Sequence, residues 1–278
     1  MKRLVVTADD FGLSVEVNKA VRRAHLDGIL TCASLMMGAP AVRDAVTMAE
    51  ADGLPVGIHL TLADGRPVLP PERVPDLVGA DGMFRTGLWG LAVRLALSPQ
   101  TLQQARAECE AQMAAFLATG LTLDHINAHH HFHLHPAILT IVIELARQCC
   151  APAVRVPFEP GAPPGRAALL GATMTPWALH ARRRLRRAGI VTNDALFGLY
   201  DSGSMTEAAW LRIAPRIRDG LTEIYCHPVV GETASPGELP SPEPLTDELD
   251  ALLSSTVRAA LDDAGIRRVS FAAAGRCR

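Results

Sequence analysis

The sequence lacks the features that mark nucleic-acid-binding, membrane-spanning and secreted proteins. Its formal net charge is only -2 at pH 7, so no strong field draws it to nucleic acid, and we expect no nucleic-acid partner. No apolar run approaches a membrane span; residues 137–143 are the nearest candidate. No secretory signal is visible either, because residues 4–6 are far shorter than the apolar core of such a signal.

The cysteines indicate the compartment in which the protein works. The six cysteines are scattered and include no CxxC pair, and the vicinal Cys149 and Cys150 are not a usual disulfide arrangement. Thiols without a disulfide framework are typical of a reducing compartment. We therefore predict a cytoplasmic protein, with any membrane association peripheral and on the inner face.

Segments typical of strands and helices alternate along the whole chain, and this alternation favours an α/β fold with a largely parallel sheet. No break in composition marks a domain boundary, so we predict one domain over residues 1–278. Residues 65–86, 161–165 and 235–244 are rich in proline and glycine and are predicted loops. The predicted helices are 14–28, 41–51, 98–120 and 136–149, and the predicted strands are 2–8, 31–37, 56–62, 121–135, 154–157, 223–227 and 268–272.

Five of the ten histidines lie in residues 129–135, with His125 just upstream. Imidazole is the commonest metal ligand, so this density predicts a metal site. If the segment is extended, His129, His131, His133 and His135 share one face and His130 takes the other. One site cannot use five imidazoles, so the roles of the remaining four histidines stay open. A solvated run that binds metal adventitiously is the alternative.

Polar residues also stand at the ends of other predicted strands: Asp9 and Asp10, His59, Arg155 and His227. Catalytic groups collect at the carboxyl ends of strands in barrels and open α/β sheets. Neighbouring strand residues point to opposite sides, so one aspartate is free to bind a metal while the other acts as a base. Each residue also has a structural alternative: a turn cap for an aspartate, a core hydrogen bond for His59, an ion pair for Arg155 and a turn for His227.

Four motifs in their order and spacing resemble the carbohydrate deacetylases of the YdjC/ChbG type. They are TADDFG at 7–12, GIHLTL at 57–62, NAHHHFHLHP at 127–136 and EIYCHP at 223–228. The commoner family pattern has Asp-Ser where this chain has Asn127-Ala128. The resemblance implies a distorted (β/α) barrel with largely parallel strands.

The resemblance also implies a role for each matching residue. Asp10, His59 and His129 correspond to metal ligands, Asp9 to the general base and His227 to the general acid. Arg155 corresponds to the residue that steadies the base. The implied reaction is metal-assisted hydrolysis of an amide, with one divalent ion: zinc, magnesium, manganese or cobalt are all compatible with one aspartate and two histidines.

Within the family, NDALFGLYDSGSM at 193–205 and FRTG at 84–87 resemble the branch associated with hopanoid biosynthesis (HpnK-like). That branch implies an N-acetylated sugar or glycolipid as partner, specifically an N-acetylglucosaminyl hopanoid. The oligomeric state is open, with a homodimer among the arrangements considered.

A basic stretch suggests how a lipid-linked substrate is reached. Arg182, Arg183, Arg184, Arg186 and Arg187 follow Trp177 and Leu179, and a basic segment beside apolar residues can dock on anionic headgroups. The equally weighted alternative is a solvated helix face.

Two other functions fit part of the pattern. A metal-dependent phosphoesterase or amidohydrolase also uses histidines at strand ends, although such enzymes often bind two metals with more carboxylate ligands. A non-catalytic, histidine-rich metal-binding protein would explain the histidine run, but not why Asp9, Arg155 and His227 accompany it.

Overall fold

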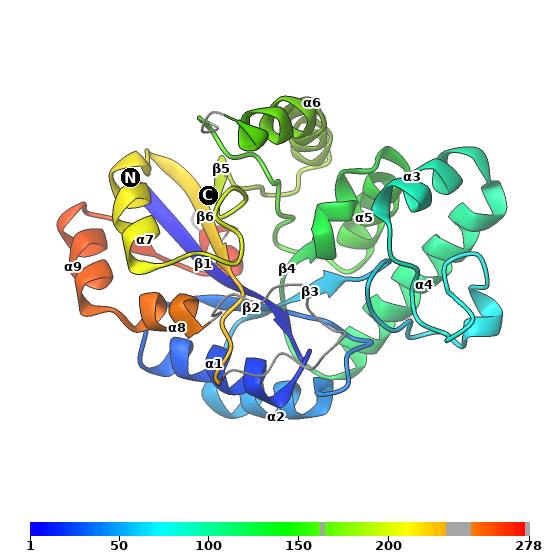
Figure 1. The fold of residues 1–278 in the computed structure, drawn as a ribbon, viewed down its shortest axis with the longest axis horizontal. Helices are drawn as coiled ribbons and strands as arrows, with labels where there is room; N and C mark the ends of the chain where they lie inside the picture. The colour runs from blue at the N-terminus through cyan, green and yellow to red at the C-terminus, as the bar shows by residue number, and fades with distance from the viewer. Residues whose placement is uncertain (162–164, 232–245, 276–278) are drawn as a thin grey trace.

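The strands form one curled parallel sheet. The computed structural model describes residues 1–161, 165–231 and 246–275. The sheet has the order β4-β3-β2-β1-β6-β5, with β7 paired to the beginning of β1, and every pairing is parallel (Figure 1). The strands are β1 Lys2–Phe11, β2 Cys32–Leu35, β3 Val56–Leu60, β4 Leu123–Ala128, β5 Ala195–Phe197, β6 Gly220–Cys226 and β7 Arg267–Arg268.

A segment after β4 joins the two edges of this sheet. The Arg155 N–H donates to Ile126 O of β4 at 3.0 Å, and the Val154 N–H donates to Val191 O at 3.0 Å. Further along, the Leu196 N–H of β5 donates to Phe158 O at 2.8 Å. The predicted strand at 154–157 is thus present only as isolated bridges, yet it connects β4 to β5. The predicted fold class, an α/β distorted barrel with largely parallel strands, is confirmed.

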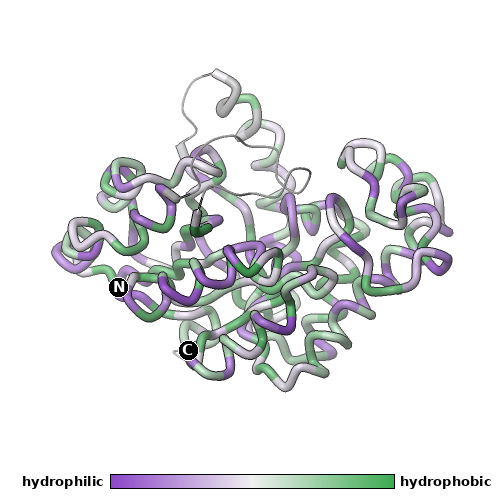
Figure 2. Tube along the Cα trace, turned by 60° about the horizontal axis from the view of Figure 1, so that its bottom comes forward, coloured by the Kyte–Doolittle hydropathy of each residue, from purple (hydrophilic) through white to green (hydrophobic). Residues whose placement is uncertain are grey.

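Helices surround the strands (Figure 1). The predicted caps hold: Ser14 Oγ accepts the Val17 N–H at 3.2 Å, and Ser98 Oγ accepts the Thr101 N–H at 3.1 Å. Figure 2 shows hydrophilic and hydrophobic residues alternating along the outer helices, as expected for helices with one packed face. The α-helices are α1 Val15–Leu26, α2 Val42–Asp52, α3 Leu88–Leu97, α4 Pro99–Ala118, α5 Pro136–Gln148, α6 Arg166–Arg187, α7 Glu207–Ile213, α8 Thr246–Leu253, α9 Ser255–Asp263 and α10 Phe271–Gly275, and the 3-10 helices are η1 Pro71–Arg73, η2 His129–Leu134 and η3 Ala214–Arg216.

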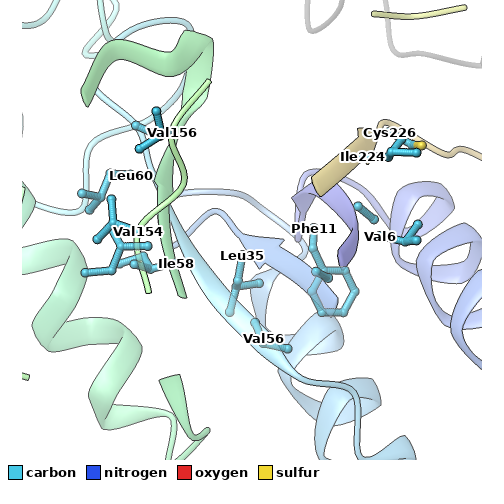
Figure 3. Close-up of a cluster of buried hydrophobic side chains, with 14 of the residues drawn as sticks. Val6, Phe11, Leu35, Val56, Ile58, Leu60, Val154, Val156, Ile224 and Cys226 are labelled. Atoms are coloured by element: carbon cyan, nitrogen blue, oxygen red, sulfur yellow. The ribbon is translucent and has the colours of Figure 1, made fainter. Parts of the chain in front are cut away.

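Alternate strand residues face different surroundings, because side chains alternate across a strand. One set is apolar and packs in the main core; Val6, Ile58, Leu60, Val154 and Ile224 belong to it (Figure 3). The other set points into the barrel. Near the beginnings of the strands this inner set is also apolar and is closed off by α10; this second cluster consists of Val5, Cys32, Ala153 and Leu221 with Phe271 and Ala274.

Toward the carboxyl ends of the strands the inner set becomes polar. Thr7 Oγ1 of β1 donates to Glu223 Oε1 of β6 at 2.8 Å, and Asn127 Nδ2 of β4 donates to Ser34 Oγ of β2 at 2.8 Å. Such contacts between different strands require that these side chains share the inner face. The barrel interior therefore changes from apolar to polar along its axis, and its polar end carries the candidate site.

Two strand predictions were wrong. The predicted strand 121–135 ends at Ala128, and η2 follows, with His130 and His131 in left-handed backbone at φ 53° and 55°. The predicted strand 268–272 is reduced to Arg267–Arg268, and α10 begins at Phe271. A periodic pattern alone did not reveal either turn.

Other predictions concern loops, cysteines and membrane spans. The predicted loop 65–86 holds η1 and a bridge between Val78 and Phe84, while the predicted loops 161–165 and 235–244 lie wholly or mostly outside the described residues. The five described cysteines are free thiols. Among the described helices, none is long and apolar enough to cross a membrane. The prediction of a single domain over residues 1–278 stays a prediction.

Close packing at Gly57 of β3 generates a stability prediction. A Cβ at Gly57 would lie 2.5 Å from the His125 ring and backbone oxygen, so Gly57→Ala should destabilise the protein by about 2 kcal/mol. At exposed Gly90 of α3 the nearest atom is 3.7 Å away, so Gly90→Ala should stabilise by about 0.5 to 1 kcal/mol. Urea unfolding of both variants measures this, and an equal effect of the two would contradict it.

Candidate active site

Three ligand atoms from three strand ends form a nearly equilateral triangle. Asp10 Oδ1 lies 3.3 Å from His59 Nε2 and 3.1 Å from His129 Nδ1, and the two histidine nitrogens are 3.3 Å apart. Ligands about 2.1 Å from a common ion are roughly 3.0 Å apart in an octahedral site and about 3.4 Å apart in a tetrahedral one. The spacing therefore fits one divalent ion.

The backbone at Asp10 creates this triangle. Asp10 has φ 60° and the pairing of β1 with β2 is irregular there, between Ala8 and Phe11. The prediction that Asp9 and Asp10 point to opposite sides was wrong, because this irregularity interrupts the alternation. Both carboxylates approach His59: Asp9 Oδ1 lies 3.9 Å from Nδ1 and Asp10 Oδ1 lies 3.3 Å from Nε2.

Asp10 is a carboxylate with one oxygen that accepts no hydrogen bond. Its Oδ1 is buried and makes no hydrogen bond within the described part of the chain. Burial by itself would raise the pKa of Asp10, but neighbouring His129 outweighs it and the pKa lies well below its usual range. A buried, charged oxygen without a donor, facing two imidazole nitrogens, matches what a metal ligand needs.

Asp9 is held by a fully buried arginine. The two terminal nitrogens of Arg155 donate to Asp9 Oδ2 at 2.5 Å and to Asp9 Oδ1 at 3.0 Å, while Nε and Nη2 donate to Glu223 Oε1 at 2.9 and 2.7 Å. Burial would raise the pKa of Asp9, but the Arg155 guanidinium outweighs it and holds that pKa well below its usual range. Asp9 is therefore an oriented carboxylate at neutral pH.

His227 stands on the other side of Asp10. It follows the end of β6, its side chain is 24% exposed, and its Nε2 lies 4.0 Å from Asp10 Oδ2. Its backbone N–H donates to Glu248 Oε2 at 2.5 Å, which fixes the turn. Asp9, Asp10 and His227 line a small recess of about 10 Å³, whose remaining walls are apolar: Leu13, Val17, Pro228 and Val229.

Of the histidine run, only His129 belongs to the triangle. The shared face predicted for alternate histidines was wrong, because η2 winds the segment into a turn. His130 is exposed, and its Nε2 pairs with Asp64 at 2.8 Å. Burial lowers the pKa of His133 to about 4 and holds the pKa of His131 well below its usual range, so both are neutral side chains.

The sequence analysis missed the residues that orient His59. The Asp9 carboxylate only accepts hydrogen bonds, so the Asn127 amide nitrogen must face it, and the two atoms are 3.1 Å apart. Asn127 Oδ1 then faces His59 and accepts from Nδ1–H at 2.7 Å. In the neutral ring, His59 Nε2 is then the nitrogen without a hydrogen, and its lone pair points into the triangle.

The same reasoning continues below Asn127. Its Nδ2 donates to Ser34 Oγ at 2.8 Å, and the Ser34 hydroxyl then donates to His125 Nε2 at 2.9 Å. His125 Nδ1–H donates to Asp124 Oδ2 at 3.0 Å, and Asp124 Oδ1 also accepts the Ala272 N–H of α10 at 2.9 Å. Each hydrogen bond from His59 to Asp124 is donated in the direction away from His59. Because the Asp124 carboxylate can only accept, it fixes this direction for all of them.

A second group of metal-binding residue types lies lower in the barrel. It consists of Cys32, Asp124 and His125, all buried. Both ring nitrogens of His125 are already hydrogen bonded, and burial raises the pKa of the Cys32 thiol well above its usual value. A protonated thiol and an occupied imidazole bind metal poorly. This group supports the site above it and does not supply a second catalytic ion.

Comparison with known proteins agrees with this arrangement. The profile of the family described as YdjC-like protein matches residues 3–263. A carbohydrate deacetylase from Brevibacillus brevis is 32% identical over 275 residues, which cover 98% of this chain and 100% of the relative. A human carbohydrate deacetylase is 31% identical over 289 aligned residues, covering 95% of this chain and 88% of the relative.

A solved structure supports the fold. The crystal structure of an Enterococcus faecalis protein, proposed to be a cellobiose-phosphate cleavage protein, superposes with a TM-score of 0.78 and 24% identity. The superposition covers 97% of each chain. At this identity the likeness establishes a shared architecture and nothing about substrate.

The triangle generates a metal-binding prediction. The protein should bind one Zn²⁺ or Co²⁺ per chain, and Asp10→Ala, His59→Ala and His129→Ala should each weaken binding by at least about 100-fold. His130→Ala is the matched control, because His130 lies in the same turn but pairs with Asp64 outside the triangle. Equilibrium dialysis with elemental analysis measures both quantities; two ions per chain, or loss of binding in the control, would contradict the assignment.

The hydrogen-bonded chain below His59 generates a separate prediction. Ser34→Ala removes one of the two acceptors of the Asn127 amide nitrogen, the other being Asp9, so His59 is less firmly held in the metal-binding tautomer and Zn²⁺ affinity should fall about tenfold. Ser98→Ala, which removes the cap of α4 far along the chain, should lower stability without changing affinity. Competition with a chromophoric chelator gives the dissociation constants, and equal constants for Ser34→Ala and wild type would refute the role of the chain.

Proposed function

The chain belongs to the YdjC-like protein family, and we propose that it is a carbohydrate deacetylase, a hydrolase that cleaves an amide bond, with its active site at the triangle. The observation that carries the proposal is the adjacency of two differently prepared carboxylates. Asp10 faces His59 and His129 with a free oxygen, while Asp9 is held by Arg155. The relatives named carbohydrate deacetylase support the reaction class.

Asp9 is the proposed base. Its Oδ2 accepts one hydrogen bond, from Arg155, and so keeps a second lone pair for the proton of an attacking water. Because Asp9 lines the pocket beside Asp10 and His227, a water bound there is within its reach. Arg155 keeps Asp9 charged and fixed, and this positioning saves reorganisation during the reaction.

His227 is the proposed acid. It lines the same pocket as Asp9 but approaches from the end of β6, and it is partly exposed to solvent. In amide hydrolysis the leaving amine must gain a proton, and a histidine at the mouth of the pocket can donate it and be reprotonated from solvent. The separation of base and acid across Asp10 gives each proton transfer its own group.

The triangle fits a divalent ion, held by Asp10, His59 and His129. Bound there, such an ion would polarise the acetyl carbonyl and make a nearby water more acidic. A carboxylate with a lowered pKa, such as Asp9, is a weak base. It therefore needs a water that the ion has made more acidic. Zinc, magnesium, manganese and cobalt all remain in the proposal, because one carboxylate and two imidazoles suit each of them.

The apolar walls of the pocket suit a small acyl group. Leu13, Val17 and Val229 contribute hydrocarbon beside the two carboxylates, in a recess of about 10 Å³. A polar reaction centre next to a short apolar recess favours an acetyl methyl group over a charged substituent. This agrees with N-deacetylation of a sugar.

For the substrate itself we propose an N-acetylglucosamine-type sugar carried on a lipid, such as an N-acetylglucosaminyl hopanoid. The branch motif at 193–205 supports this choice by its place in the fold. Gly198, at φ 106°, packs so closely that a Cβ would lie 2.6 Å from Tyr225 O, and the Tyr225 ring lies 5.5 Å from the His227 ring. The segment that resembles this branch thus packs against Tyr225, whose ring lies next to the proposed acid, and through Tyr225 it can affect substrate choice.

The two alternative functions, a phosphoesterase and a non-catalytic metal-binding protein, predict different arrangements of residues. A two-metal phosphoesterase needs a second ion next to the first, and among the described residues the other candidate group lies below the site with its imidazole occupied. A metal-binding protein without catalysis gives no reason for a buried Arg155 on Asp9. The cytoplasmic location and the homodimer remain predictions.

Loss of the base gives the test of function. Metal-loaded wild type should release acetate from N-acetylglucosamine-containing substrates, and Asp9→Asn should release it about 100- to 10,000-fold more slowly while still binding the metal. Asp64→Asn is the control, since Asp64 pairs with His130 at the edge of the site. No acetate from any free or lipid-linked substrate would sink the deacetylase proposal, whereas normal rates in a folded Asp9→Asn variant would remove Asp9 from it.

A further inference from the structure

Exposed apolar side chains gather on two helices. Eleven large hydrophobic residues are exposed among those described, and six of them lie on α3 and α6. Both exposed tryptophans belong to these six: Trp89 is 83% exposed and Trp177 is 51% exposed. On α3 the exposed residues repeat at every fourth position, so they form one stripe. The six are Trp89, Val93 and Leu97 on α3 and Leu169, Trp177 and Leu179 on α6.

The same two helices lie in the parts of the chain that carry no acidic residue. The two longest stretches without aspartate or glutamate are residues 82–107 and 160–193, and they contain α3 and α6. Every charged residue in these two stretches is an arginine. Aromatic and aliphatic side chains on helices without acidic residues are suited to the interface of an anionic bilayer.

The structure shows which arginines of the predicted basic segment are available for lipid headgroups. Arg182 donates to Asp194 O at 3.0 Å, Arg184 to Thr140 Oγ1 at 3.0 Å and Arg186 to Asp194 Oδ1 at 2.6 Å. These three arginines stabilise the fold. Arg183 and Arg187 are exposed and have no partner within the described residues, so they are the two cations of the segment that remain available.

Both helices adjoin the turn that carries His129. The His135 side chain, which follows η2, lies close to the Ala92 backbone of α3, and α6 packs against η2 and α5. Figure 1 shows α6 and α3 on the same side of the molecule, with α5 between them in the view. A surface that these helices rest on would therefore lie next to the proposed active site.

We propose that the exposed faces of α3 and α6 dock the protein on an anionic lipid bilayer. Both helices carry arginines and no acidic residue, so a second copy of the same face would bring like charges together and is a poorer occupant than an anionic bilayer. A bilayer accepts a few aromatic and aliphatic side chains with flanking arginines. The purpose of docking rests on the proposed function, because a lipid-linked sugar must be met at the membrane.

Vesicle co-sedimentation tests the docking without catalysis. Wild type should bind vesicles of phosphatidylcholine and phosphatidylglycerol, and bind less in 0.5 M NaCl. The Trp89→Ser/Leu97→Ser and Arg183→Gln/Arg187→Gln variants should each bind at least about fivefold more weakly. Leu26→Ser and Arg43→Gln are matched controls on α1 and α2, where the side chains are also exposed, and they should bind as wild type does.

The outcomes separate the docking from the proposed function. Absent vesicle binding by wild type, or unchanged binding by both double variants, would overturn the docking. Dissociation of a dimer by Trp89→Ser/Leu97→Ser with vesicle binding intact would assign the face to a second copy and overturn it too. The variants should hydrolyse a short soluble N-acetylated sugar as wild type does; if wild type binds vesicles but hydrolyses no sugar, the function fails and the docking stands.

Discussion

One buried guanidinium holds this molecule together at the point where it acts. Arg155 has no exposed surface and lies between Asp9 of β1 and Glu223 of β6, and its own backbone is bonded to β4. The segment that joins the two sheet edges is thus fixed to strands on the far side of the barrel. Removing the arginine would leave two buried carboxylates uncompensated, which costs several kcal/mol. Closure of the barrel and orientation of the base are consequences of the same contact.

The barrel interior explains why the site is rigid. Asp9 and His59 lie on strands that are paired on both sides, and Asn127 lies on β4, which pairs with β3 and is bridged to Val154. The side chains hydrogen bond to one another across these strands. Helices pack on the opposite, apolar face of the same strands (Figure 3). Groups that must meet a reacting atom within a few tenths of an ångström are best carried by such elements. Two segments outside the strands, η2 and the turn after β6, supply His129 and His227.

The sequence was sufficient for the general plan and insufficient for the local backbone. The strand-end rule indicated the edge of the sheet, the family resemblance implied Asp10, His59 and His129 as ligands, and the structure places their ligand atoms within 3.3 Å of one another. It failed where the backbone takes left-handed values, at Asp10 and in the histidine run, since no periodicity encodes a positive φ at a residue other than glycine. Glu223 and Ser34 were missed, although a polar residue at an inner position of an apolar strand was a usable signal. Helix α3 was missed because its composition is nearly all apolar.

Asn127 has a further consequence, which concerns electroneutrality. Asp9, Asp10, Asp124 and Glu223 are buried in the barrel with a single buried arginine, Arg155. An aspartate at position 127, the residue the commoner family pattern has there, would add another buried carboxylate. Asparagine keeps the hydrogen bonds to His59 and Ser34 without adding a negative charge. The amide at position 127 therefore limits the buried negative charge that an ion in the triangle would have to offset.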